Sequence, residues 1–512
     1  MRSAGMSTRS AWADGFGRTL LYSPPAMKRV SKTISGSDTA AANAVIEPIQ
    51  SDASLDALTV IYSRATRPAI LETSLEKGTY ARYSIFAADP ADRMVHHPDM
   101  RECPLGRLED RSATYPRQEP SELPIPFSGG WIGYFAYEAG LRIEGVPCST
   151  KADIPVPLAE FHLYDAAAVY DHAERQWYAV AIVWPAPWSR QRPSASHRIG
   201  LIRDRLRAAE RLRRSITSPF TPVGPHRLAQ SNMSDEEYWA GVRRAKEYIE
   251  AGDVFEVNLT RRFTVETKAS PLEIYRRLRR VSPSSHAALL TGSGYTIISS
   301  SPELFLDLRG DHVVTRPIKG TRPRFDDPLL DESARCDLIE SEKDRAELNM
   351  IIDLLRNDLG RVCRYGSIRV LSDGEIETHP AVFHRVAAIE GRLDAENNIF
   401  DLLRATLPGG SITGAPKIRA MQIIDELEPT ERGVYCGTIG YIGLDGSASF
   451  NIAIRTMVHS GQRVHLYAGG AVVADSDPQS EHEEVLAKAR GMFQALNCRA
   501  PTDRQPAWAA RC

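Results

Sequence analysis

The sequence predicts a mixed fold in which strands and helices interleave without forming a doubly wound sheet. Three observations support this prediction. The first half of the chain contains short apolar runs separated by Gly, Pro and Asp, as in strands joined by turns. The second half alternates such runs with capped amphipathic helices. The regular strand–helix–strand period and the GxGxxG fingerprint of a dinucleotide-binding fold are both missing.

The two ends of the chain are predicted to lie outside the fold. Residues 1–45 are basic and rich in Ser, Ala and Thr, which fits a disordered tail or a start site placed too early, with Met27 as the true start. An organelle transit peptide is the alternative. Residues 499–512 are expected to form a second disordered tail. Between these tails we expect a strand-rich region over 46–215 and a second region over 232–498.

Apolar runs predict the strands of the first region. They are Ala69–Glu72, Tyr80–Phe86, Gly129–Phe135, Ala167–Tyr170 and Trp177–Trp184. The glycines of the third run suit a strand packed closely against another backbone. Residues 196–214 have helical spacing, and the prolines that follow predict a linker: Pro219, Pro222 and Pro225.

Helices and strands alternate through the second region. Ser234 and Glu237 predict a capping box for a helix that ends at Gly252, and 254–263 alternates as a strand. Further helices are predicted over 271–280, 337–358, 415–428 and 477–496, the last with a proline in its first turn. A strand is predicted over 312–315. Pro317 and Gly320 then predict a turn with Lys319 at its tip.

Composition narrows the class of protein. The chain has 512 residues, of which 42% are hydrophobic and 25% charged, as is usual for a globular protein. A net charge of −2 predicts no nucleic-acid partner, and the short apolar runs predict no membrane span. The seven cysteines are dispersed and form no CxxC pair. This pattern argues against disulfides and structural zinc, and it favours a reducing, cytoplasmic location.

Acidic residues on two predicted helices indicate a metal site. Glu347 borders the apolar stripe of its helix, and Glu484 shares a face of the last helix with Glu481 and Lys488. Carboxylates without His or Cys companions suit a hard ion that keeps water ligands, which means Mg²⁺. The alternative is that both acidic faces are simply solvated.

Lys319 and Glu303 are candidates for covalent and acid chemistry. A lysine can act as a nucleophile when burial or a nearby cation lowers its pKa. Two glycine-rich segments, 408–417 and 468–478, could bring a ligand close to the backbone. The first leads into a helix N-terminus and lacks a GK[ST] ending, so a carboxylate suits it better than a triphosphate.

The order of several motifs resembles the chorismate-using enzymes, which include anthranilate synthase component I and aminodeoxychorismate synthase component I. The similarity runs over 232–498 and, more weakly, over 60–190. The matching blocks are GDVFEVNLTRRF, SSSPELFL, PIKGTRPR, ESEKDRAELNMIIDLLRNDLGRV, LPGGSITGAPKIRAMQIIDELE, RGVYCGTIGY, FNIAIRT and GGAVVADSDPQSEHEEVLAKA.

This resemblance implies an α+β fold of two antiparallel β-sheets packed as a sandwich, with helices outside. It also implies roles for single residues. Glu347 and Glu484 would bind Mg²⁺, and Glu303 would protonate the departing C4 hydroxyl of chorismate. Contacts around the ring and the enolpyruvyl group are implied for His384, Ser411, Tyr435 and Arg455. Contacts with carboxylates are implied for Gly469, Gly470 and Lys488. Ala471 departs from the family pattern, in which glycine is common there.

Position 319 divides the family members. Anthranilate synthases typically have alanine in a PIAGT segment, whereas aminodeoxychorismate synthases often have lysine in PIKGT, as here. The resemblance thus implies that Lys319 attacks C2 of chorismate, that ammonia then adds at C4, and that 4-amino-4-deoxychorismate forms for para-aminobenzoate and folate biosynthesis. We expect Mg²⁺ and nearby arginines to lower the pKa of Lys319. A separate glutaminase subunit would supply the ammonia, because the sequence lacks a glutaminase signature.

Three alternatives remain at this point. Anthranilate synthase is the main one, and an isochorismate or salicylate synthase is another. The third is a non-catalytic binding subunit, because 69–74 resembles the Leu-Leu-Glu-Ser segment that binds tryptophan in anthranilate synthases. Thr73 interrupts that pattern.

Overall fold

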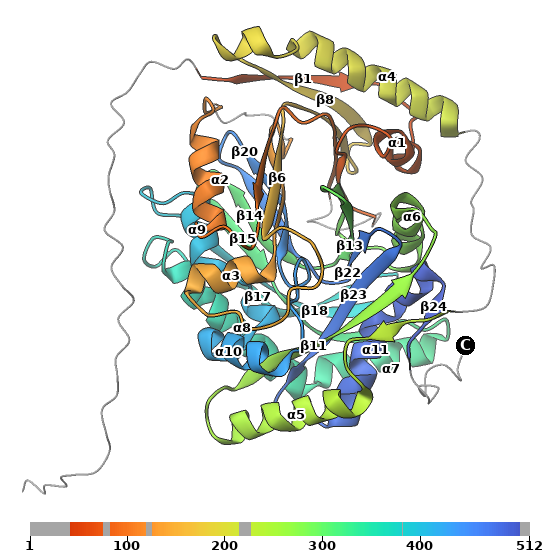
Figure 1. Cartoon of the computed structure of the whole chain (residues 1–512), viewed down its shortest axis with the longest axis vertical. Helices are drawn as coiled ribbons and strands as arrows, with labels where there is room; N and C mark the ends of the chain where they lie inside the picture. Colours follow the sequence, from red (N-terminus) through yellow and green to blue (C-terminus); the bar gives the residue numbers. More distant parts are fainter. Residues whose placement is uncertain (1–40, 75–81, 119–124, 214–226, 381, 502–512) are drawn as a thin grey trace, which may run out of the picture. The chain divides into compact units, whose positions relative to one another are not determined.

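The computed structural model describes residues 41–74, 82–118, 125–213, 227–380 and 382–501. Two large β-sheets dominate it, and their neighbouring strands run antiparallel (Figure 1). Helices cover the outer faces of the sheets. The α+β fold with two antiparallel sheets that the family resemblance implies is therefore confirmed.

The first sheet has twelve strands, eleven of them in one continuous order, while β19 pairs with β11 at one side. Its strands in spatial order are β1 (Asn43–Ile49), β8 (Gln176–Val183), β7 (Ala166–Asp171), β3 (Tyr83–Ala87), β2 (Ala69–Glu72), β12 (His286–Thr291), β13 (Tyr295–Ser301), β22 (Thr456–Ser460), β23 (Arg463–Val472), β11 (Glu256–Glu266) and β10 (Gln230–Ser231), with β19 (Gly414–Ala415).

The second sheet has ten strands, and β17 pairs with β18 beside the main path. Its order is β16 (Ile318–Pro323), β18 (Val382–Arg392), β15 (His312–Arg316), β14 (Leu304–Arg309), β21 (Ala448–Ile452), β20 (Thr438–Gly443), β5 (Gly130–Phe135), β6 (Ala159–Tyr164) and β4 (Asp92–His96), with β17 (Arg369–Thr378). Two short strands, β9 (Arg227–Leu228) and β24 (Cys498–Arg499), form a separate parallel pair.

Both sheets contain strands from both halves of the sequence. In the first sheet β2 pairs with β12, and in the second β5 pairs with β20. The inner faces of the sheets share one apolar cluster, in which Ile132 and Ile439 of the second sheet join Val169 and Ile297 of the first. The strand-rich N-terminal region and the C-terminal region therefore share one core between the sheets.

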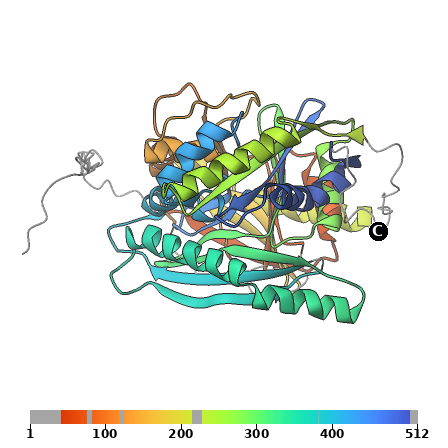
Figure 2. The same cartoon turned by 90° about the horizontal axis from the view of Figure 1, so that it is seen from below.

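Helices flank this sandwich, and Figure 2 shows α7 and α8 lying along strands of the second sheet. The helices are α1 (Leu55–Tyr62), α2 (Pro104–Ala113), α3 (Tyr137–Glu144), α4 (Ala195–Arg213), α5 (Asp235–Glu250), α6 (Pro271–Val281), α7 (Pro328–Glu340), α8 (Glu342–Gly360), α9 (Ile399–Thr406), α10 (Lys417–Leu427) and α11 (Pro478–Leu496). Short 3₁₀ turns occupy Trp188–Gln191 and Gly410–Ile412. Among the described residues, we find no helix long and apolar enough to cross a membrane.

Most local predictions agree with these elements. Ser234 and Glu237 form the predicted capping box of α5, and Asp477 caps α11 in front of Pro478. A Cβ atom at Gly133 would lie 2.1 Å from the carbonyl oxygen of Glu160, so this strand does need glycine for close backbone contact. The described cysteines are all free.

Four predictions about boundaries differ from the structure. The expected helix over 337–358 is two helices, because the Ser341 hydroxyl accepts the Asp344 N–H and starts α8 anew. Arg385 donates to the freed carbonyl groups of Leu338 and Ile339 at the end of α7. Helix α10 starts at Lys417, because Gly414–Ala415 pairs with β11.

The other two differences lie at the ends of the fold. Strand β1 begins at Asn43 and β24 includes Arg499, so the fold reaches into the ranges 1–45 and 499–512 that were predicted to be tails. Residues 1–40 and the predicted proline linker lie outside the described residues.

Candidate active site

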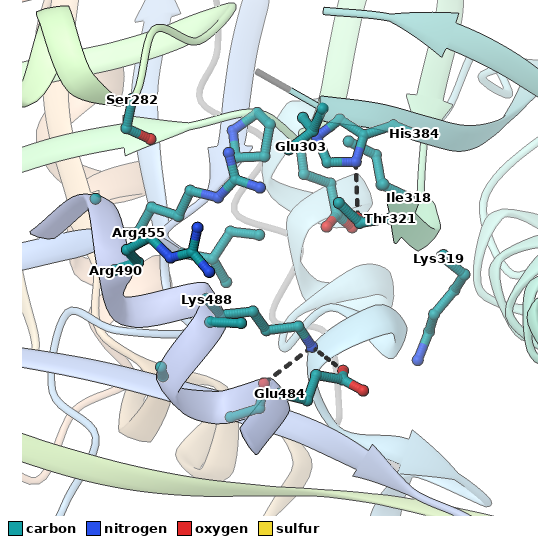
Figure 3. Close-up of a pocket in the computed structure, with 18 of the residues that line it drawn as sticks. Ser282, Glu303, Ile318, Lys319, Thr321, His384, Arg455, Glu484, Lys488 and Arg490 are labelled. Atoms are coloured by element: carbon teal, nitrogen blue, oxygen red, sulfur yellow. Dashed lines mark hydrogen bonds and ion pairs between the residues drawn. The ribbon is translucent and has the colours of Figure 1, made fainter. Parts of the chain in front are cut away.

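A cavity of about 620 Å³ gathers the predicted site residues (Figure 3). Strands of both sheets, the 3₁₀ turn Gly410–Ile412 and helices α8 and α11 contribute to its wall. The predicted residues that line it are Glu303, Lys319, Glu347, His384, Ser411, Tyr435, Arg455, Gly469, Glu484 and Lys488. These residues come from segments far apart in the sequence, so the fold brings together all but one of the residues that the resemblance implies.

Gly470 is the predicted residue that does not line the cavity. A Cβ atom added to it would lie 2.8 Å from Oε2 of Glu481 and 3.7 Å from Oε1 of Glu484. Its missing side chain therefore lets the carboxylates of α11 approach strand β23. Only part of the glycine-rich segment 408–417 lines the cavity. Ser411 lines the cavity, whereas Lys417 pairs with Asp358 at 2.6 Å and does not line it.

Lys319 lies in strand β16 and not at the tip of a turn, as the sequence predicts. The pairing of β16 with β18 shifts register between Ile318 and Thr321, and Gly320 has a φ of +83°. Pro317 and Gly320 thus mark an irregularity in a strand, because β18 continues to pair on both sides of it. This irregular strand places the Lys319 side chain, 8% exposed, on the wall of the cavity.

Carboxylates surround the amine of Lys319. Its Nζ lies 2.6 Å from Oε1 of Glu256 and 4.0 Å from Oε2 of Glu347. Burial alone lowers the pKa of Lys319, but these two negative charges outweigh burial and raise the pKa above its usual value. The expectation that nearby arginines lower this pKa is therefore wrong, because the surrounding carboxylates favour the ammonium form.

Glu303 has the properties of a general acid. It lies between β13 and β14, is 4% exposed, and accepts a hydrogen bond of 2.5 Å from the Ser411 hydroxyl. Burial raises the pKa of Glu303 to about 7, although the Ser411 hydrogen bond and the charge of Lys319 lower it. A carboxyl group with this pKa carries a proton in a large fraction of molecules at neutral pH, so it can protonate a leaving group.

The proposed metal ligands lie on different helices and approach each other at the cavity. Glu347 belongs to α8 and Glu484 to α11, where Lys488 Nζ lies 2.7 Å from the Glu484 carboxylate. Lys343 Nζ lies 3.9 Å from Glu347 and 3.7 Å from Glu481. Within the described ranges, no group of three or more His, Cys, Asp or Glu side chains is arranged to enclose a metal ion.

The chemistry of these acids nevertheless fits a divalent cation that retains water or substrate ligands. Burial raises the pKa of Glu347 to about 7, and the nearby Glu256 and Glu484 carboxylates add to this effect against Lys319 and Lys343. The buried Oε2 of Glu481 also lacks a hydrogen-bond partner in the described structure. Crowded, partly unsatisfied carboxylate oxygens are a donor set that Mg²⁺ prefers.

The opposite side of the cavity is basic. Figure 3 shows the guanidinium groups of Arg455 and Arg490 on the side across from Lys319. No described residue provides a counter-ion for Arg455, and burial lowers its pKa to about 10. Such an arginine is suited to a ligand carboxylate, which would supply the missing charge.

His384 and Tyr435 shape the rest of the wall. Nδ1 of His384 hydrogen-bonds to the Thr321 hydroxyl at 2.9 Å, and burial together with Arg455 holds the pKa of His384 well below its usual value. The imidazole is therefore neutral. Tyr435 stacks on Tyr467 with ring centroids 5.2 Å apart, which gives the cavity a flat apolar surface.

Sequence reasoning missed Glu256 and Arg490. Glu256 is fully buried in β11 and is the closest carboxylate partner of Lys319 in the described structure. The available signal was an acid between the apolar residues Phe255 and Val257 at the start of an alternating strand, because such a residue needs a partner when it is buried. Arg490 lies two residues after Lys488 on α11, and nothing in the helical pattern distinguishes it from a solvated residue.

The segment that resembles a tryptophan-binding motif lies elsewhere. Glu72 is 2% exposed and lines a second cavity of about 270 Å³. Its carboxylate lies 2.6 Å from Arg279 and accepts a hydrogen bond from the Tyr275 hydroxyl. Glu72 therefore has partners within the chain.

Comparisons with known proteins identify the family of this chain. Residues 68–494 match the family described as chorismate binding enzyme. Aminodeoxychorismate synthase component 1 of Klebsiella aerogenes is 36% identical over 439 residues, covering 83% of this chain and 93% of that protein. Anthranilate synthase component 1 of Streptomyces coelicolor is 38% identical over 432 residues, covering 83% of each protein.

A solved structure has the same fold. Anthranilate synthase component I from Streptococcus pneumoniae TIGR4 matches with a TM-score of 0.68 and 32% identity, covering 81% of this chain and 93% of the other. The match to the family extends over most of the sequence and includes every strand of the two large sheets except β1. The chain therefore belongs to the family of chorismate-binding enzymes.

Proposed function

We propose that this chain is component 1 of an aminodeoxychorismate synthase, which converts chorismate and ammonia into 4-amino-4-deoxychorismate. One observation carries the proposal. The amine of Lys319 lies on the wall of the same cavity as the carboxyl group of Glu303. A nucleophile and an acid that share one cavity are the groups that a substitution through a covalent intermediate requires.

Although the ammonium form of Lys319 is favoured, in the proposed reaction the fraction of Lys319 that is neutral amine attacks C2 of chorismate. The ring double bonds shift, the C4–O bond breaks, and the hydroxyl leaves as water with the proton of Glu303. Ammonia then adds at C4, the double bonds shift back, and the C2–N bond to Lys319 breaks. The Glu303 carboxylate takes up the proton that the incoming nitrogen loses. Both side chains return to their starting states, and the enolpyruvyl group stays on the ring.

Other residues of the cavity would hold the substrate. The guanidinium of Arg455 and the amine of Lys488 would pair with carboxylates, and the Gly469 backbone lets a ligand approach closely. Tyr435 and the neutral imidazole of His384 would contact the ring and the enolpyruvyl group. Glu347 and Glu484 would hold Mg²⁺, which supplies positive charge for the ring carboxylate when it is bound.

Nitrogen supply is part of the same proposal. The related proteins are named as component 1 of their synthases. We infer that a separate glutaminase subunit releases ammonia from glutamine and passes it to this chain, which acts in the cytoplasm. The product would lead to para-aminobenzoate and folate.

Anthranilate synthase is the second candidate function. The 38% identity to the Streptomyces coelicolor protein favours it as strongly as the 36% identity to the Klebsiella aerogenes protein favours aminodeoxychorismate synthase. Lys319 decides our preference, because anthranilate formation has no use for a nucleophilic amine at C2.

Product analysis tests the proposal. The purified chain would be incubated with chorismate, Mg²⁺ and an ammonium salt, and the products would be separated and identified by mass. We expect 4-amino-4-deoxychorismate, which retains the enolpyruvyl group, and no release of pyruvate. Anthranilate together with an equal amount of pyruvate would instead establish the second candidate.

A further inference from the structure

The ion pair between Lys319 and Glu256 is buried on both sides. Lys319 is 8% exposed and Glu256 is 0% exposed. Oε1 of Glu256 accepts from Lys319 Nζ at 2.6 Å and from Asn258 Nδ2 at 3.2 Å, whereas the buried Oε2 lacks a hydrogen-bond partner among the described residues. Because a buried ammonium needs a charged partner, Glu256 fixes where the amine of Lys319 stands.

The second carboxylate near the Lys319 amine belongs to Glu347, which is one of the two proposed metal ligands. Lys319 Nζ is 4.0 Å from Glu347, so a small rotation of the lysine side chain would exchange Glu256 for Glu347. The exchange would place an ammonium group against a carboxylate that a cation needs. Like charges compete strongly for a partner in a partly buried site, where their interaction is only weakly screened.

We propose that Glu256 is a positioning residue that keeps the Lys319 ammonium away from Glu347 and so leaves the Glu347–Glu484 pair available to Mg²⁺. This inference rests on the proposed function for the metal ligands. It does not require that Lys319 be a nucleophile. Glu256 does not line the cavity, so it acts on the metal site through Lys319 and not by binding the cation.

Metal binding without substrate provides the test. Mg²⁺ would be titrated into the full chain by calorimetry, and thermal melting would confirm that each variant is folded. We expect Glu256→Gln to weaken Mg²⁺ binding by about tenfold or more, because the released ammonium pairs with Glu347. Glu256→Asp retains the charge and should keep most of the affinity. The matched control Glu250→Gln changes an exposed acid on α5 and should have no effect.

The double variant Glu256→Gln/Lys319→Met separates positioning from general damage. It removes both charges of the buried pair, so we expect Mg²⁺ affinity at the wild-type level or above. If affinity stays low in the double variant, or never falls in Glu256→Gln, the positioning role is wrong while the metal site stands. If the wild-type chain itself fails to bind Mg²⁺, the proposed metal site is wrong and this inference is overturned with it.

Discussion

Glu303 shows how one residue acquires its chemistry from its surroundings. Burial raises the pKa of its carboxyl group, and the Ser411 hydroxyl and the charge of Lys319 oppose that rise. Because the resulting pKa is about 7, the protonated and the ionised forms of Glu303 are both well populated at neutral pH. A group in this range can both give and accept the proton that the proposed reaction moves.

Removing the Ser411 hydroxyl should shift the pH dependence of the reaction. The hydroxyl donates to the ionised carboxylate and so lowers the pKa of Glu303, which means that Ser411→Ala should raise this pKa further. Because the acid works in its protonated form, the alkaline limb of kcat/KM for chorismate should move up by about one pH unit. The measurement is a pH profile at a fixed concentration of free ammonia.

A serine outside the cavity provides the control for this shift. Ser447 donates a similar hydrogen bond of 2.6 Å to Asp445, and Ser447→Ala should leave the profile in place. A Ser411→Ala profile with an unchanged or lowered alkaline limb would show that Glu303 is not the titrating acid.

At the scale of elements, helices α8 and α11 each contribute one proposed metal ligand. We expect EDTA to abolish turnover and Mg²⁺ to restore it. Glu347→Gln or Glu484→Gln should lower kcat/KM by more than about 100-fold, because each removes a charged ligand. Thermal melting should show that both variants remain folded.

The matched control for these variants lies next to Glu484. Glu483 is exposed on α11, and Glu483→Gln should retain normal activity. Full turnover in the presence of EDTA would contradict the proposal that the reaction requires Mg²⁺ bound by Glu347 and Glu484.

The connection between α10 and β20 depends on one buried ion pair. Arg432 is 1% exposed and contacts both carboxylate oxygens of Glu428, at 2.9 and 2.7 Å. It also donates to the carbonyl groups of Ile412 and Asn258, which ties the 3₁₀ turn that contains Ser411 to strand β11. This pair therefore holds together three segments that line or border the cavity.

Breaking that pair should cost stability. Arg432→Met leaves the Glu428 carboxylate buried without its partner, and we expect the free energy of unfolding in urea to fall by about 3–5 kcal/mol. The double variant Arg432→Met/Glu428→Gln should recover part of the loss, because it removes the unpaired charge. A loss below about 1 kcal/mol in the single variant would mean that the pair does not organise this region.

For the whole molecule, the proposed reaction requires an external source of ammonia. The isolated chain should form product with an ammonium salt at alkaline pH, where more of the nitrogen is free ammonia. With glutamine it should be inactive until a glutaminase subunit is added. The rates of product formation with ammonium and with glutamine can both be measured by mass spectrometry of the product. Glutamine-dependent turnover by the pure chain would contradict the need for a partner.

Much of this architecture could be predicted from the sequence. Caps such as Ser234 and Asp477 act locally, so the ends of α5 and α11 follow from short patterns. The joining of β2 with β12 and of β5 with β20 depends on contacts between distant segments, which no local pattern contains. The break at Ser341 was missed because a serine in a helical stretch becomes a cap only when neighbours such as Arg385 satisfy the carbonyls it frees.

Most residues of the candidate site were predicted from family motifs, and few were predicted from the spacing of residues along helices and strands. Residues such as Glu303 and Lys319 could be named because they lie in matching blocks, and the cavity does bring them together. The environment of Lys319 could not be predicted, because Glu256 reaches it from another strand in the other sheet. For the same reason the sequence led us to expect a lowered pKa for Lys319, whereas its pKa is raised.

Covalent catalysis by Lys319 is tested by the mass of the intact chain after mixing with chorismate and Mg²⁺ in the absence of ammonia. We expect a chorismate-derived adduct that peptide mapping assigns to Lys319. Lys319→Ala should lack the adduct and lose aminodeoxychorismate formation, and Lys319→Arg should not rescue it, because a guanidinium stays protonated. Near-normal aminodeoxychorismate formation by Lys319→Ala would contradict covalent catalysis by this residue and would favour direct attack by ammonia.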